Sequence, residues 1–87
     1  MDHDTFVAAL AREGFAAPVP VRREPGTLAE HAHSFEAKAL IVAGEITLRV
    51  AGVDTVYRPG DVFHLPADTP HIEFYGPDGV DYLAGRK

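Results

Sequence analysis

The chain has 87 residues, a formal net charge of −5 and no cysteine, and its 46% hydrophobic content is that of a folded globular protein. Thirteen acidic residues outnumber eight basic ones, and the basic residues form no run, so neither nucleic acid nor an anionic membrane is an expected partner. No apolar segment reaches the roughly 20 residues of a membrane helix, and the first residues do not resemble a leader, so we expect a cytoplasmic protein.

The first expected element is a short helix over residues 4–14. Asp4 is a candidate N-cap, an apolar stripe follows it, and Gly14 supplies a stop signal. The next residues, 15–27, contain three prolines and a glycine, which favours an extended arm with at most an edge strand at Val19–Arg23.

From Leu28 onward the hydrophobic period changes to two, which is typical of short strands. Residues 46–50 alternate, Ala51-Gly52 makes a tight reversal and residues 53–58 return, so we expect a hairpin whose alternate residues from Ile46 face the core. Further strands are expected at Val62–Leu65, His71–Tyr75 and Val80–Ala84, separated by turns at Pro66–Pro70 and Gly76–Gly79. The pattern predicts an all-β fold, a small antiparallel β-barrel or jelly roll with a short N-terminal helix.

The size of the chain allows a single domain, with the helix and arm at residues 1–27 and the barrel at residues 28–87. A domain this small buries only about 60% of the surface that its unfolded chain exposes, so its stability is marginal. Without cysteine, the remaining ways to stabilise it are a bound metal and a partner subunit. We therefore expect a homodimer in which the arm crosses between subunits.

Three histidines have a spacing that suits a metal site. His31 and His33 lie two residues apart, so on a strand both imidazoles occupy one face about 6.6 Å apart, within reach of one ion. His71 begins a later strand that could lie beside the first. From spacing alone, these residues are either metal ligands or hydrogen-bonded histidines on unrelated strands. His3 is expected in solvent, and His64, between two apolar residues, is expected outside the barrel.

The two histidine segments resemble the two sequence motifs of the cupin superfamily. In the first, Gly26 precedes His31-Ala-His33 and Gly44 closes the motif. The second runs from Gly60 to His71, with Tyr75 at the position of the family's asparagine. The resemblance covers residues 26–75, most of the chain.

The resemblance implies a cupin barrel that holds a divalent metal ion, Fe, Mn, Ni or Zn, through His31, His33 and His71. It also implies a small-molecule ligand as the partner of the site. The phrase Arg-Pro-Gly-Asp-Val-Phe at residues 58–63 is especially similar to the family's second motif.

The chain lacks the family's usual carboxylate ligand, because Ala37 or Lys38 stands at its position. Glu36 has the opposite strand parity to the histidine pair, so it is expected to point outward unless a β-bulge turns it inward as a ligand. Glu73 shares the parity of the last histidine of the site, so it is a possible additional ligand, an imidazole partner or a solvated acid at the barrel mouth. Tyr75 is expected in the pocket.

The fold does not fix the chemistry. A three-histidine centre with open positions resembles that of thiol dioxygenases, which implies a metal-dependent enzyme acting on a small molecule, dioxygenase-like or isomerase-like. Its acid-base candidates are Tyr57, Tyr75, Tyr82 and Glu73. The alternative is a non-catalytic or sensor-type module that binds a small acidic or sugar-like ligand. A third hypothesis is a structural metal that stabilises the barrel.

Overall fold

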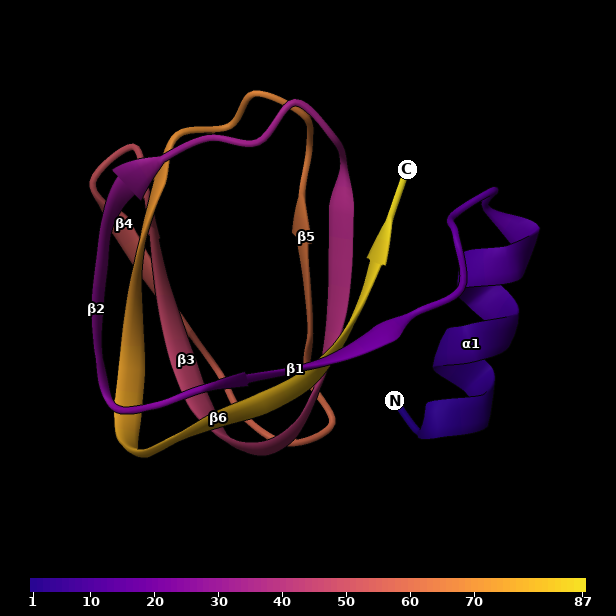
Figure 1. Ribbon diagram of the computed structural model, residues 1–87, viewed down its shortest axis with the longest axis horizontal. Coiled ribbons are helices and arrows are strands. Elements are labelled where there is room, and N and C mark those ends of the chain that lie inside the picture. The colour runs from indigo at the N-terminus through magenta and orange to yellow at the C-terminus, as the bar shows by residue number, and fades with distance from the viewer.

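The computed structural model describes all 87 residues and consists of one helix and six strands (Figure 1). In chain order the elements are α1 (His3–Arg12), β1 (Val19–Arg23), β2 (Gly26–His31), β3 (Ala37–Val50), β4 (Val53–Tyr57), β5 (Val62–Leu65) and β6 (His71–Arg86). The edge strand β1 and the short strand β5 have the bounds that the sequence predicts. The single helix is too short to cross a membrane.

The two long strands, β3 and β6, organise the fold because each pairs with different partners along its length. Residues 71–75 of β6 pair with β2, and residues 46–50 of β3 pair with β4. These segments form the first layer. Residues 80–84 of β6 pair with β1, and residues 37–40 of β3 pair with β5, and these form the second layer. The long strands also pair with each other in both layers, which gives the antiparallel, jelly-roll-like fold that the sequence predicts (Figure 1).

Two glycines allow the long strands to bend between the layers. Gly44 and Gly79 have φ angles of 73° and 74°, in the left-handed region that favours glycine. A Cβ atom on Gly44 would lie 2.1 Å from the carbonyl oxygen of Gly79, so no larger residue fits there. Register shifts in β3 accompany the bend. They change the strand parity, so that Ile41 before the bend and Ile46 after it both face the core.

The turn expected at Gly76–Gly79 is wrong as a strand boundary. Strand β6 runs unbroken from His71 to Arg86, because it stays paired with β3 on both sides of this segment, at Tyr75 and at Val80. The glycines and the proline bend the strand without ending it.

The main core lies between the two layers, and the helix packs on the outside of the second layer. The core between the layers consists of Ala39, Ile41, Ile46, Leu48, Phe63, Leu65, Val80, Tyr82 and Ala84. Phe6 and Leu10 of α1 are buried against Leu40, an outward-facing residue of β3. Burying two such side chains contributes about 1.5–3 kcal/mol each. The helix begins earlier than expected, because Asp2 rather than Asp4 caps it by accepting a hydrogen bond from the Thr5 N–H.

Candidate metal centre

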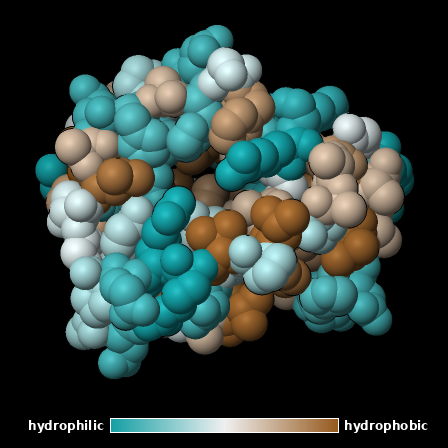
Figure 2. Space-filling view, in the orientation of Figure 1, coloured by the Kyte–Doolittle hydropathy of each residue, from teal (hydrophilic) through white to brown (hydrophobic).

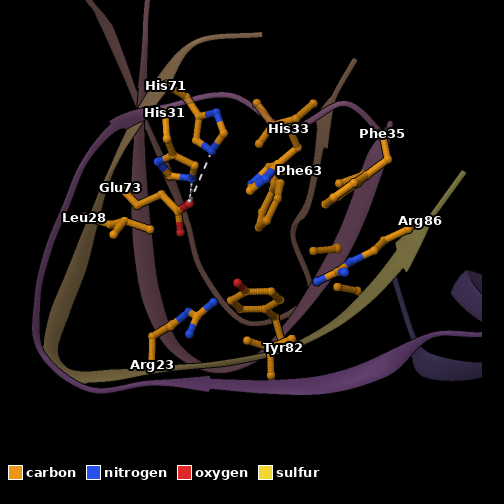
Figure 3. Close-up of a pocket in the computed structure, with 15 residues that line it drawn as sticks. Arg23, Leu28, His31, His33, Phe35, Phe63, His71, Glu73, Tyr82 and Arg86 are labelled. Atoms are coloured by element: carbon orange, nitrogen blue, oxygen red, sulfur yellow. Dashed lines mark hydrogen bonds and ion pairs between the residues drawn. The ribbon is translucent and has the colours of Figure 1, made fainter. Parts of the chain in front are cut away.

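Four side chains converge on one point at the cavity side of the first layer. The donor atoms of His31, His33, His71 and Glu73 all lie within 4.8 Å of one another. His31 ends β2 directly opposite His71 on β6, and His33 follows in the connection to β3. His71 and Glu73 are buried, with 1% and 7% of their surface exposed, while the other two histidines are partly buried. Segments far apart in sequence thus form one cluster (Figure 3).

Backbone carbonyls orient two of the imidazoles. The Nδ1 atom of His31 lies 2.8 Å from the carbonyl oxygen of Ala29, and that of His71 lies 2.9 Å from the carbonyl oxygen of Thr69. A carbonyl oxygen only accepts, so each Nδ1 carries the proton and donates it. In the neutral ring the Nε2 atom then has a free lone pair, and both Nε2 atoms face the cluster. This is the arrangement in which histidine binds a metal.

The carboxylate of Glu73 faces these lone pairs. Its Oε2 atom lies 3.1 Å from Nε2 of His31 and 3.2 Å from Nε2 of His71. Its Oε1 atom accepts a hydrogen bond of 3.1 Å from the Tyr75 hydroxyl. The His31 Nε2 atom is buried and has no hydrogen-bond partner. Acceptors that face each other in a buried site need a cation or an added proton between them, so the donor set fits a divalent metal ion.

His33 completes the cluster from its more open side. Its ring lies 4.8 Å from the His31 ring and 5.4 Å from the His71 ring, and it stacks on Phe35 at a centroid distance of 4.8 Å. Partial burial, and then the neighbouring His31 and His71, lower the pKa of His33 below its ordinary value of 6.5. The neutral imidazole, which can bind a metal, is therefore favoured at this position.

The remaining candidates lie outside the cluster. Glu36 makes an ion pair with the exposed His64 and so lies apart from the metal cluster. It stands in the connection between β2 and β3, outside any strand, so the parity expected for it does not apply. Lys38 pairs with Glu13 of the α1 C-cap. Tyr75 stands behind Glu73, where its hydroxyl holds the carboxylate, and it is not among the residues that line the adjoining cavity. Burial of Glu73 excludes the interpretation of this residue as a solvated acid.

A cavity of about 90 Å³ extends from the cluster into the space between the two layers. Figure 2 shows the hollow on the molecular surface, with polar side chains around its rim and apolar atoms inside. Its apolar wall includes Phe63 and Leu65 of β5. Tyr82 points its hydroxyl into the cavity from the second layer (Figure 3). Burial, and then the charge of Glu73, raise the pKa of this phenol, so it stays protonated at neutral pH.

Sequence reasoning missed several residues that line the cavity, among them Arg23, Arg86 and Phe35. Strand parity was a usable signal for both arginines. Arg23 has the parity of Val21 on β1, and Arg86 has the parity of Tyr82 on β6, and all four side chains line the cavity.

The fold and the cluster together define a class, a jelly-roll-like protein with a histidine and carboxylate group able to hold a metal ion. A profile of the cupin domain family matches residues 21–73, more than half of the chain. The chain therefore belongs to the cupin family. Comparison with curated protein sequences finds no match.

Solved structures support the fold. An RmlC-like cupin from Shewanella frigidimarina is 25% identical, with a TM-score of 0.67 over 80% of this chain and 63% of that chain. A cupin-2 domain containing protein from Shewanella frigidimarina is 13% identical, with a TM-score of 0.68 over 78% of this chain and 66% of that one. KdgF from Halomonas sp. is 22% identical, with a TM-score of 0.66 over 80% and 68% of the two chains. The chain thus spans less than two thirds of the length of the two Shewanella proteins.

Proposed function

We propose that this cupin binds one divalent metal ion through His31, His33 and His71, with Glu73 as an additional ligand or as a partner of the imidazoles. The observation that carries the proposal is the pair of Nε2 atoms that face the Glu73 carboxylate while both Nδ1 protons are held by backbone carbonyls. Because the Nε2 lone pairs and the carboxylate are all acceptors, a divalent ion at this point would be a common partner for them.

We propose further that the site acts on a small molecule, as a metal-dependent enzyme of dioxygenase-like or isomerase-like chemistry. A bound metal ion supplies Lewis-acid or redox chemistry at the wall of the cavity. Around it, the chain's own residues provide a restricted apolar space and the protonated hydroxyl of Tyr82, which can donate a hydrogen bond or a proton to a substrate oxygen. Phe63 and Leu65 form an apolar wall on one side of this space.

The second candidate function is a non-catalytic module, such as a sensor, that binds a small ligand at the same metal. The observation that favours it is the state of the acid-base groups. Glu73 is engaged with His31, His71 and Tyr75, and Tyr82 is held in its protonated form, so no free general base faces the cavity. Oxygen uptake and product analysis with thiols and small hydroxy acids separate the two candidates, because only the enzyme turns substrate over.

Metal titration tests the proposal. We expect calorimetry with zinc or cobalt(II) to give one site per chain in the wild type and a large loss of affinity in His31→Ala, because two imidazoles hold a first-row ion far less tightly than three. The matched control is His64→Ala, which removes an exposed histidine outside the cluster and should leave the affinity unchanged. Equal affinity in all three proteins would contradict the proposal.

We also propose a cytoplasmic homodimer. Its support is β1, an edge strand of the sheet, where Val19 is 50% exposed. A shallow groove beside this strand is lined by Pro20, Val42 and Leu83, and Val42 is 55% exposed. A second copy of the chain that covered this edge would bury additional apolar surface, which stabilises a domain whose own core is small.

A further inference from the structure

We propose that the cavity binds a compact carboxylic acid as its ligand. Arg23 and Arg86 would hold the carboxylate group of this ligand on the side of the cavity opposite the histidine cluster. The inference rests on the metal site proposed above and names the class of molecule that this site binds. The two arginines belong to the second layer, on β1 and at the end of β6, whereas the histidines and Glu73 belong to the first layer. Figure 3 shows both guanidinium groups directed into the cavity, facing the histidine cluster across it.

Neither of these arginines has a carboxylate partner within the chain. Three of the other four arginines do: Arg22 lies 3.0 Å from Asp81, Arg49 lies 2.7 Å from Asp54, and Arg58 lies 3.8 Å from Glu45. The fourth, Arg12, ends the helix α1 far from the cavity. The chain has more acidic than basic residues, so acidic partners are not scarce. Two arginines nevertheless lie on one cavity without an ion pair. Arg23 lies within hydrogen-bonding reach of the Tyr82 hydroxyl, which also faces the cavity. The N–H groups that a pocket-facing guanidinium keeps available are suited to bind an anion.

The side chain of Arg86 is held in place by an aromatic ring. Its guanidinium carbon lies 4.6 Å from the centroid of the Phe35 ring, whose other contact is the stacked imidazole of His33. Stacking fixes the plane of the guanidinium while leaving its N–H groups free to donate at the edge. The same aromatic ring therefore positions one metal-cluster residue and one anion-binding residue on the same cavity.

The charge of the cavity also favours an anion. With a divalent ion bound, the walls would carry the two charges of the ion and one each from Arg23 and Arg86, against the single negative charge of Glu73. A ligand with one carboxylate at the arginines and a second oxygen group near the metal would offset much of this excess. Hydrogen bonds between an arginine and a ligand carboxylate are strong because both partners are charged.

The volume of the cavity limits the ligand to a compact molecule. About 90 Å³ is well below the 300–1,000 Å³ of pockets for drug-sized ligands, so the space suits a short-chain acid and not a sugar chain or a peptide.

Malonate, a short dicarboxylate, is the probe that tests this inference, and malonamide is its uncharged match. Cobalt(II) binding is first measured for each variant by calorimetry, and malonate and malonamide are then titrated into the cobalt-loaded proteins. We expect malonate to bind the wild type, and Arg23→Gln and Arg86→Gln each to weaken it about 10-fold or more, the usual loss for one charge-assisted hydrogen bond. Cobalt affinity should stay unchanged, and malonamide should not distinguish the variants.

Arg22→Gln is the matched control, because Arg22 lies next to Arg23 on β1 and pairs with Asp81 outside the cavity. It should bind malonate like the wild type. Arg23→Lys, which keeps the charge, should recover part of the affinity. Equal malonate affinity in all variants, or tighter binding of methylphosphonate than of malonate, would overturn the inference while leaving the metal site in place. Failure of the wild type to bind cobalt would instead overturn the metal proposal.

Discussion

Replacing Glu73 by glutamine probes the metal cluster with almost no change of shape. The substitution removes the negative charge that lies 3.1 Å from the His31 Nε2 atom and 3.2 Å from the His71 Nε2 atom. It keeps one side-chain oxygen that can accept the hydrogen bond from Tyr75. The buried charge is therefore the main property that changes.

We expect the affinity for a divalent ion to fall about 10-fold to 100-fold, the range typical of losing a carboxylate that supports metal-binding histidines. This corresponds to about 1.4–2.8 kcal/mol of binding free energy. The stability of the metal-free protein should not fall, because the glutamine amide can donate a hydrogen bond to the lone pair of the His31 Nε2 atom, which has no partner in the structure.

Two measurements check this prediction together. Zinc titration in competition with a chelator gives the metal affinity, and thermal unfolding in the presence of EDTA gives the stability of the metal-free form. Glu36→Gln is the matched control, because Glu36 pairs with His64 outside the cluster and should change the metal affinity little. An unchanged zinc affinity in Glu73→Gln would refute the role of the carboxylate and leave a centre of three histidines.

Three further predictions concern stability, pH and assembly. Gly44→Ala should destabilise the fold by about 2 kcal/mol or more in urea unfolding, because the new methyl group meets the Gly79 carbonyl at a left-handed backbone position; a loss below about 0.5 kcal/mol would contradict the packing at the bend. Burial raises the pKa of Tyr75 and Tyr82 above the ordinary value of 10.0, so the stability they contribute is fully present below pH 10 and is lost as the pH rises through their folded pKa. Tyr82→Phe should therefore make stability fall less steeply above pH 10, and an unchanged slope would count against this burial. Light scattering at micromolar concentration should give the mass of a dimer, and a monomer would contradict the proposed assembly.

Much of the fold follows from local patterns in the sequence. The alternation at residues 46–50 of β3, the Ala51-Gly52 turn that follows it and the prolines around the edge strand β1 each predict their element, because these signals are local in the sequence. The continuous strand β6 was not predictable in this way. Gly76 and Gly79 are turn signals in sequence, and only pairing with a distant strand keeps this segment extended.

The candidate site was also predictable from the sequence only in part. His31, His33 and His71 were predictable because imidazole is a common metal ligand and His31 and His33 lie two residues apart. The structure brings all three together with Glu73. Arg23 and Arg86 did not stand out. They lie far apart in the sequence, on β1 and at the end of β6, and the pairing of these two strands places both on the cavity side of the second layer.

The central claim is that the three histidines hold one ion, and metal content tests it most directly. Elemental analysis of the protein, loaded with zinc or cobalt(II) and then dialysed, should give one ion per chain for the wild type. It should give little or none for His31→Ala, His33→Ala or His71→Ala. Binding in the wild type should also weaken at acidic pH, because a protonated imidazole has no lone pair to donate. Since burial lowers the pKa of His33 below 6.5, its protonation should begin to weaken binding only below that pH. Equal metal content in the wild type and the three variants would contradict the account.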